Sequence, residues 1–414
     1  MDDVYFRDLI NHAMRAGAQD ACVDEVRTIR DEDRIEGGRV SQERTITSKA
    51  VLYVKMSRAL TRLSLSEEAP LSLETAKSRV EDAVKAARLV EAWSQFPGCD
   101  VVPELDEDDT YRYIDPFDED PDAPKKRQKA FEAFMDSTTT ERAPILLKEH
   151  ARMRSVSGDV TLLAKQVIER RTQRRITASD AVTASSGSTR LERRISWNRG
   201  ANASTLLLPD YVQTGYGIEP DTPESGYIQD SSELAQGYAL SCRASRHFDR
   251  SVKAFILGAW ASCVVLHETV HQSPYYLGQT EAIAIDRDRG ILQCSGPKTN
   301  CSAYAIHPTT PEPHSLEMVL AQSVEDALYV DAPTFIVRHA DTSIDVTFSI
   351  VRSIHEHAWH EAFRPVTLKI VPNNFWKSIK IAFGPLCRIS LHCLKGEPTF
   401  QAPGLCLGLP PVIV

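Results

Sequence analysis

The sequence predicts an α+β protein with two domains, an N-terminal α+β domain over residues 1–135 and a β-rich C-terminal domain over residues 136–414. Three observations support this: helical spacing of apolar residues near the start, alternating apolar and polar residues around a glycine turn, and a change to short β-like runs after the first third. A chain of 414 residues is long enough for each domain to bury its own core.

A helix is expected over residues 3–16. Phe6, Leu9 and Ile10 recur at the spacing that places apolar side chains on one face of a helix. Gly17 follows them and can adopt the left-handed conformation that ends many helices. The chain is therefore expected to begin with an amphipathic helix.

Two strands and a further helix complete the first domain. Apolar and polar residues alternate on both sides of "EGGR", residues 36–39, which is typical of antiparallel strands joined by a tight glycine turn. Residues 72–93 are typical of a long helix, with Ser72 as the expected N-cap and Glu74 in the first turn, where a carboxylate complements the helix dipole. Together these elements predict one compact unit.

A strongly acidic segment lies near the end of the first domain. Residues 104–122 read "ELDEDDTYRYIDPFDEDPD" and contain ten acidic residues. Such a segment buries little apolar surface, so we expect a surface linker or lid. A calcium loop is the alternative, but the glycine-centred spacing of an EF-hand is absent. A helix over residues 125–136 is expected after this linker.

The second domain is expected to consist mainly of strands. Residues 332–351 and 365–372 are rich in β-branched and aromatic residues and are bounded by turn-forming ones. One exception is the apolar run "AFILGAWASCVVL", residues 254–266, which we expect to form a buried helix. It falls short of the roughly 20 residues that cross a bilayer, so no membrane association is expected.

Composition and charge exclude several classes of function. The net charge is −9, from 48 basic and 57 acidic residues, so the mean field would repel a nucleic acid. The acidic start "MDDVYFRDLI" does not match a signal peptide. Nine cysteines without a Cys-x-x-Cys pair suggest reduced thiols. We therefore expect a cytoplasmic protein that does not bind nucleic acid.

The motif "HETVH", residues 267–271, follows the apolar run directly. Residues four apart lie on one face of a helix, so His267 and His271 could bind one zinc ion. Glu268 would then be placed to accept a proton from a water that the zinc activates. The alternative is a chance grouping in a buried helix, where unpaired polar side chains would be costly. The spacing after His271 does not identify a third ligand.

A second histidine-rich segment, "HEHAWHE", covers residues 355–361. On a helix, its HExxxH spacing could also bind a metal. It lies among strand-like segments, however, where His355 and His357 would share one face and His360 would point away. A solvated strand is therefore expected here.

Four segments of the chain resemble the TldD/PmbA family of cytoplasmic metallopeptidases. Residues 13–42 and 71–89 are similar to the family's opening helix, strand and glycine hairpin and to the helix after its first sheet. Residues 363–384 and 393–414 are similar to its closing strands and to its Cys-x-Lys-Gly segment, with a "GLPP" ending. The resemblance covers most of the chain.

The resemblance also implies a metal site. In the family, zinc is bound by two histidines of a helical HExxxH motif and by the cysteine of the late Cys-x-Lys-Gly segment. Carried over, His267, His271 and Cys393 are the zinc ligands, Glu268 is the general base, and Lys395 favours the thiolate or stabilises a developing oxyanion. HETVH is one residue shorter than the family spacing, which changes the ligand geometry.

The implied function is that of a zinc-dependent peptidase, which hydrolyses flexible peptides or unfolded segments in a closed chamber between subunits. The peptide substrate would bind by adding a strand to an exposed sheet edge. The alternative, favoured by the shortened motif, is a non-catalytic PmbA-like partner subunit of a peptidase complex. Both imply a homodimer or a heterodimer with a related subunit. A structural zinc site is a third possibility, and the alternative ligands are Glu281, His307 and His314.

Overall fold

The structure is a computed structural model of the chain. It describes residues 3–36, 39–57, 59–65, 72–93, 122–154, 156, 158–214, 228–249, 252–271, 284–285, 291–292, 303–305, 316, 318–319, 326–391, 399–408 and 412–414.

The fold is α+β, as the sequence predicts, and is built on two large sheets. The first sheet has seven strands in the order β3-β2-β1-β4-β5-β6, with β7 also paired to β5, and all its pairs are antiparallel. Its strands are β1 (Asp20–Glu36), β2 (Arg39–Lys55), β3 (Leu60–Ser64), β4 (Val160–Ile176), β5 (Ala181–Arg199), β6 (Asn202–Leu207) and β7 (Tyr211–Thr214).

The first sheet therefore contains strands from both sides of residue 135, where the sequence predicts the domain boundary. β4 pairs along the length of β1, from Val23 opposite Ile176 to Ile35 opposite Ala164. The predicted hairpin is present, since Glu36 of β1 pairs with Arg39 of β2. Residues 37 and 38, at its turn, lie outside the described residues.

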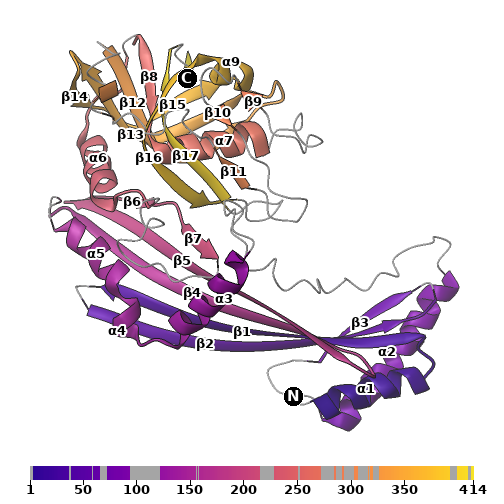
Figure 1. Cartoon of the computed structure of the whole chain (residues 1–414). Coiled ribbons are helices and arrows are strands. Elements are labelled where there is room, and N and C mark those ends of the chain that lie inside the picture. The colour runs from indigo at the N-terminus through magenta and orange to yellow at the C-terminus, as the bar shows by residue number, and fades with distance from the viewer. Residues whose placement is uncertain are drawn as a thin grey trace.

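The predicted N-terminal helices are confirmed. Helix α1 covers Asp3–Arg15 and is followed by Gly17 with φ of 102°, the left-handed conformation expected there. Helix α2 covers Leu73–Trp93, and the hydroxyl of Ser72 accepts a hydrogen bond from the backbone N–H of Thr75 at 3.2 Å. Both helices lie at the end of the first sheet that is far from the second sheet (Figure 1).

Three further helices lie along the first sheet nearer the second one (Figure 1). They are α3 (Ala123–Asp136), α4 (Thr139–Arg142) and α5 (Pro144–Met153). Helix α3 confirms the expected helix over residues 125–136. Of the acidic linker at residues 104–122, only the last residue lies within the described part of the chain.

The second sheet is mixed and has nine strands, in the order β11-β17-β8-β12-β13-β15-β18, with β14 also paired to β13 and β16 to β17. The pairs β8–β12 and β11–β17 are parallel. The strands are β8 (Ala254–Leu257), β11 (Ala303–Ala305), β12 (Asp326–Arg338), β13 (Ile344–His355), β14 (Ala358–Ala362), β15 (Val366–Ile370), β16 (Ile379–Ser390), β17 (Thr399–Leu407) and β18 (Val412–Ile413).

The remaining described elements accompany the second sheet. β9 (Ala284–Ile285) and β10 (Ile291–Leu292) form a separate two-stranded sheet. The helices are α6 (Ser231–Arg243), α7 (Ala259–Leu266) and α9 (Pro372–Ser378), and α7 continues into a π-helical turn, η3 (His267–His271).

The expectation of one helix across residues 254–266 is wrong for the first four residues. Ala254–Leu257 forms strand β8, and α7 begins only after Gly258. A short apolar run that is buried on all sides suits a central strand as well as a helix, so periodicity alone cannot separate the two. Gly258 marks the break, and a Cβ there would lie 1.9 Å from Oδ2 of Asp331, so only glycine fits.

One hydrophobic core joins the second sheet to the near end of the first. It contains Trp197 and Leu206 of the first sheet, Leu234 of α6, and Val265 and Phe348 of the second domain. Helix α6 lies between the sheets in Figure 1. The first sheet therefore holds α6 against the second sheet, while its far end carries α1 and α2 on a core of their own.

Two further expectations concern the cysteines and the membrane. Five cysteines of the described residues are free thiols: Cys22, Cys242, Cys263, Cys387 and Cys406. Among the described residues, no helix is both long and apolar enough to cross a bilayer.

Candidate metal site

Helix α7 carries the HETVH motif into the interior. Seven of its eight residues are buried, and it contacts β12, β16 and β17. At its C-terminal end the chain continues as the π-helical turn η3, in which each hydrogen bond spans one residue more than in an α-helix. The turn is therefore wider than the regular α-helix that the i,i+4 argument for His267 and His271 assumes. Such turns often occur at functional sites.

His267 and Glu268 are buried side by side. Their exposed fractions are 5% each, and Nδ1 of His267 lies 2.7 Å from Oε1 of Glu268. The imidazole ring packs edge-on against Phe400 of β17, with ring centroids 5.2 Å apart. The motif thus begins with an imidazole whose orientation is fixed by a carboxylate on one side and by an aromatic ring on the other.

Arg338 completes this arrangement from the end of β12. Its Nε donates a hydrogen bond of 2.7 Å to Oε2 of Glu268, so both carboxylate oxygens of Glu268 are engaged. The side chain of Arg338 is 54% exposed, whereas that of Glu268 is 3% exposed. The ion pair therefore lies at the surface of the site, with its carboxylate inside.

The ionisation of Glu268 follows from these contacts. Burial works to raise the pKa of this carboxyl, but hydrogen bonds and charge from His267 and Arg338 outweigh burial and hold the pKa below its usual value. Glu268 is therefore a carboxylate at neutral pH, the form that a general base requires.

Replacing Arg338 by glutamine is expected to cost about 1 kcal/mol of unfolding free energy at pH 7, because the guanidinium is half exposed and Glu268 keeps its contact with His267. The pKa of Glu268 is lower in the folded protein than in the unfolded chain, where it is about 4.3. The ion pair therefore stabilises the fold fully above this unfolded pKa, and the stabilisation is lost as the pH falls through the folded pKa. The measurement is urea unfolding of wild type and Arg338→Gln from pH 7 to pH 3. If the difference in unfolding free energy between wild type and Arg338→Gln grew as the pH fell, the lowered pKa of Glu268 would be contradicted.

The contact between His267 and Glu268 fits that of a zinc-binding histidine with the carboxylate that orients it. A histidine that binds zinc usually donates its other ring N–H to a carboxylate, which fixes the tautomer and the ring orientation. His267 and Glu268 are arranged in this way, so Nε2 is the ring nitrogen that would bind a metal. Tautomer assignment follows from the partner, because a carboxylate accepts only from an N–H.

The side chains of the other predicted site residues lie outside the described residues. The backbone of His271 belongs to η3, but its side chain is outside the described residues, as are Cys393 and Lys395. The alternative ligands Glu281, His307 and His314 are also outside them. Within the described part of the chain, no three His, Cys, Asp or Glu side chains are grouped as a metal site.

The second histidine segment forms a hairpin rather than one strand. β13 ends at His355, Glu356 and His357 form the turn with φ of 47° and 64°, and β14 begins at Ala358. The hairpin brings the rings of His355 and His360 to 6.0 Å between centroids, whereas a single strand would point them apart. All three histidines are exposed, which agrees with a solvated surface.

Arg338 is the site residue that sequence reasoning missed. It lies 70 residues from Glu268, at the end of a strand where nothing in the local pattern marks it. Only the pairing of β12 beside β8, the strand that leads into α7, brings the two together. Knowledge of the sheet order would have been needed to find it.

The fold is similar to that of several solved structures. No family model matches the sequence, and no curated protein matches it. A candidate modulator of DNA gyrase from Bacteroides thetaiotaomicron superposes with a TM-score of 0.61 at 11% identity, covering 99% of this chain and 98% of that chain. TldE from Thermococcus kodakarensis superposes with a TM-score of 0.59 at 10% identity, covering 99% of both chains.

A third solved structure extends this agreement. A candidate modulator of a DNA gyrase from Thermotoga maritima has a TM-score of 0.54 at 10% identity, and 99% of both chains is covered. The chain therefore has the fold of these proteins over its whole length. The resemblance to the TldD/PmbA family is confirmed at the level of the fold.

Proposed function

We propose that this protein is a zinc-dependent peptidase that hydrolyses flexible peptides or unfolded segments, with His267, His271 and Cys393 as zinc ligands and Glu268 as the general base. The observation that supports it best is the buried contact between Glu268 and His267 at the end of α7. Zinc, when bound, would supply a Lewis acid for the scissile carbonyl and an activated nucleophile at neutral pH.

The side chains of this chain have separate roles in the proposal. Glu268 orients His267 through Nδ1 and, being ionised, can accept a proton from the attacking nucleophile. Each of its oxygens has a second lone pair that can take this proton. Arg338 is the partner that is easier to displace, because its side chain is half exposed and such pairs are worth about 1 kcal/mol or less.

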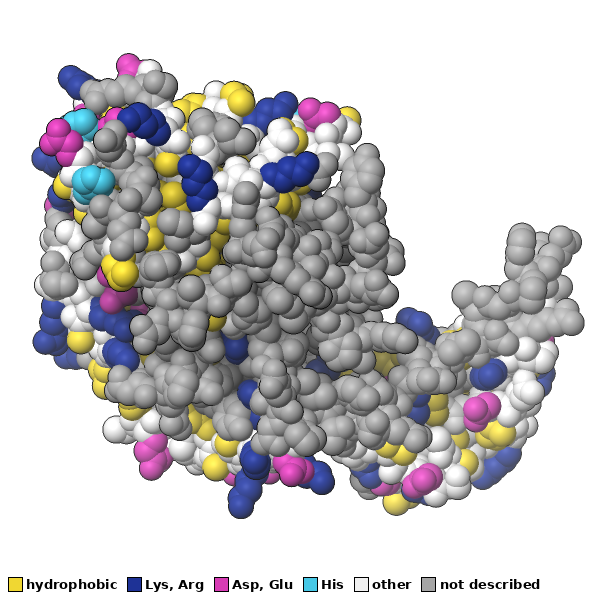
Figure 2. Space-filling view, turned by 45° about the horizontal axis from the view of Figure 1, so that its top comes forward, with side chains coloured by type: hydrophobic (Ala, Val, Ile, Leu, Met, Phe, Trp, Pro, Cys, Tyr) yellow, Lys and Arg dark blue, Asp and Glu magenta, His cyan; other side chains and the backbone are white. Residues whose placement is uncertain are grey.

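The described residues on the face shown in Figure 2 give no reason to prefer a polyanionic substrate. Figure 2 shows basic side chains in small groups, interspersed with acidic and uncharged ones on the face that it presents. With a net charge of −9, long-range attraction would favour neutral or basic peptides over acidic ones.

A non-catalytic partner subunit is the second candidate, favoured by the engagement of both oxygens of Glu268. A carboxylate held by His267 and Arg338 is a weaker base than a free one, since its pKa is lowered. In this case the same contacts serve only to hold the end of α7 in place.

Glu268→Gln separates the two roles of the glutamate. If Glu268 is the base, the variant keeps zinc but its peptide hydrolysis falls by about 100-fold or more. If Glu268 only orients His267, zinc affinity falls by about 10–100-fold and excess zinc restores hydrolysis. The measurements are zinc content and cleavage of an unstructured fluorogenic peptide, with Arg364→Gln, an exposed arginine outside the site, as control.

The same assay tests the proposal as a whole. Zinc-loaded wild type should cleave the peptide, and His267→Ala should neither retain zinc nor cleave. Wild type that carries no zinc and cleaves nothing, alone or with a related subunit, would leave only the partner-subunit function.

A further inference from the structure

A second candidate site lies at the opposite end of α7 from the HETVH motif. It is a partly open pocket with a volume of about 640 Å³, lined by α6, the start of α7 and strands β12, β13, β14, β16 and β17. Helix α7 has eight residues, so about 12 Å of helix separates this pocket from His267. The pocket is large enough for a small organic molecule.

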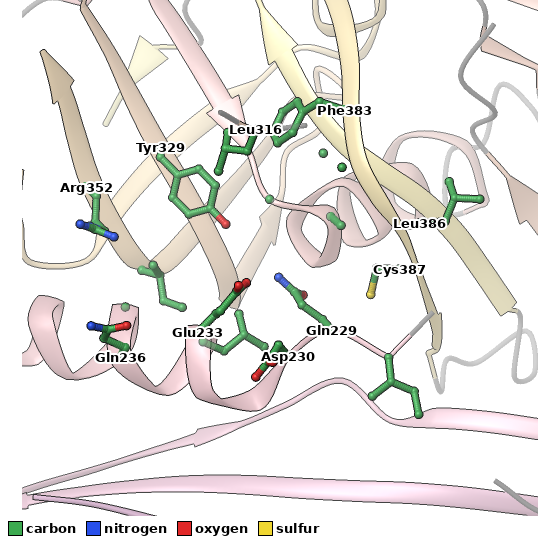
Figure 3. A pocket seen from close by; sticks show the side chains of 18 of the residues that line it. Gln229, Asp230, Glu233, Gln236, Leu316, Tyr329, Arg352, Phe383, Leu386 and Cys387 are labelled. Carbon is green, nitrogen blue, oxygen red and sulfur yellow. The ribbon is translucent and has the colours of Figure 1, made fainter. Parts of the chain in front are cut away.

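Arg352 forms one side of the pocket (Figure 3). Its guanidinium lies over the ring of Trp359, with Cζ 4.1 Å from the ring centroid, and Tyr329 packs edge-on against the same ring at 5.2 Å. Neither a hydrogen bond nor an ion pair engages the guanidinium among the described residues. Partial burial lowers its pKa, because burial disfavours the charged form.

An arginine held in this way is suited to bind an anion. Stacking on an aromatic ring fixes the plane of the guanidinium, and its N–H groups can bind a carboxylate through two parallel hydrogen bonds. Arg338, by contrast, has a carboxylate partner in Glu268. The pocket therefore presents a preoriented cation that has no ion-pair partner among the described residues.

The α6 side of the pocket presents hydrogen-bond acceptors. Gln229 donates from Nε2 to Oδ2 of buried Asp331 at 2.9 Å, which fixes the orientation of its amide, and its Oε1 is buried without a hydrogen-bond partner. Glu233 is exposed on α6 and has neither an ion pair nor a hydrogen bond among the described residues. In Figure 3 both lie near the hydroxyl of Tyr329.

The framework around these acceptors is rigid. Arg193 of β5 donates hydrogen bonds to the carbonyl of Gln229 at 2.7 Å and to the hydroxyl of Ser231 at 2.8 Å. Tyr329 donates its hydroxyl proton to Asp331 at 3.0 Å. The polar side chains are thus positioned before any ligand binds, which lowers the entropic cost of binding.

Apolar surface in the pocket is supplied by Leu234, Leu316, Ile350 and Phe383. From this combination we propose that the pocket binds an α-carboxylate next to an apolar side chain, with Arg352 holding the carboxylate and Gln229 and Glu233 accepting from the neighbouring amine or amide N–H. Two ligands share this chemistry: a free apolar amino acid and the C-terminal residue of a peptide. The site is separate from the proposed zinc site and does not depend on it.

Binding of four probes tests the proposal: L-leucine, L-leucinamide, and a pentapeptide ending in leucine with a free or an amidated C-terminus. Titration calorimetry on the full chain should detect binding of leucine, of the peptide with a free C-terminus, or of both. Each amide should bind at least tenfold more weakly than its acid. Binding of leucine alone identifies a free amino acid, and binding of the peptide acid alone identifies a peptide terminus.

Arg352→Gln should weaken binding of the carboxylate ligand at least tenfold, because it removes the cation but keeps a polar side chain. Arg364→Gln, on an exposed arginine outside the pocket, should bind as wild type does. Thermal unfolding checks that both variants are folded. Failure of all four probes to bind at millimolar concentration, equal binding of acids and amides, or unchanged binding by folded Arg352→Gln would each overturn the proposal.

Discussion

Replacing Arg142 by methionine is expected to lower the free energy of unfolding by about 3–5 kcal/mol, because it leaves the buried carboxylate of Asp33 without its arginine and that of Asp31 with Arg44 alone. The guanidinium binds Asp33 through Nε at 3.0 Å and Nη2 at 3.2 Å, and binds Asp31 through Nη1 at 3.0 Å. Both aspartates and Arg142 are almost completely buried. Arg44 also binds Asp31, through two hydrogen bonds of 2.6 Å.

The pKa values of Asp31 and Asp33 are shifted in opposite directions. Burial works to raise the pKa of Asp31, but Arg44 and Arg142 outweigh it and hold the pKa below its usual value. Burial raises the pKa of Asp33 despite its contact with Arg142. Without the arginine, Asp33 is the residue that would become protonated, so Arg142→Met should be less destabilising at pH 4 than at pH 7.

Urea unfolding at both pH values measures this effect, with two companion variants. Arg142→Lys keeps the charge but not the forked geometry, so it should fall between wild type and Arg142→Met. Arg142→Met combined with Asp33→Asn should recover part of the loss, because the second change removes the stranded charge. A loss below 1 kcal/mol for Arg142→Met would contradict the buried network.

Replacing Asp331 by alanine is expected to cost about 3 kcal/mol, because at least two buried backbone N–H groups would lose their acceptor. Oδ1 accepts from the backbone N–H of Ala261 at 3.0 Å and of Ala332 at 2.8 Å, and Oδ2 accepts from Gln229 and Tyr329. Asp331 therefore provides the N-terminal cap that Gly258 cannot give to α7.

Asp331→Asn is the matched control. It keeps one acceptor oxygen and nearly the same volume, so its loss should be clearly smaller than that of the alanine variant. Denaturant unfolding gives both values, and hydrogen exchange should show faster exchange in α7 for Asp331→Ala. If the alanine and asparagine variants are equally stable, Asp331 does not hold the start of α7.

Local sequence patterns predicted the helices and strands that have one buried face and one face in solvent. The apolar spacing of Phe6, Leu9 and Ile10 predicts α1, and the cap at Ser72 predicts the start of α2. The apolar run at 254–266 is buried throughout, so it carries no periodicity to separate β8 from α7. The pattern reveals the periodicity of an element only where one of its faces meets solvent.

The site was predictable only in part, for a related reason. HETVH can be read from five consecutive residues, whereas the contact between His267 and Glu268 is known only from the structure. The contacts of Arg338 and Asp331 depend on which strands are neighbours, and strand order is set by long-range pairing. Arg352 and Gln229 meet in one pocket for the same reason, although neither belongs to a motif.

Zinc stoichiometry of the purified protein tests the central proposal most directly. Wild type that has been incubated with zinc and then dialysed should retain about one zinc ion per chain, and His267→Ala should retain none, while both show the same cooperative unfolding. Equal zinc content in the two proteins, or none in either, would contradict a metal site at the end of α7.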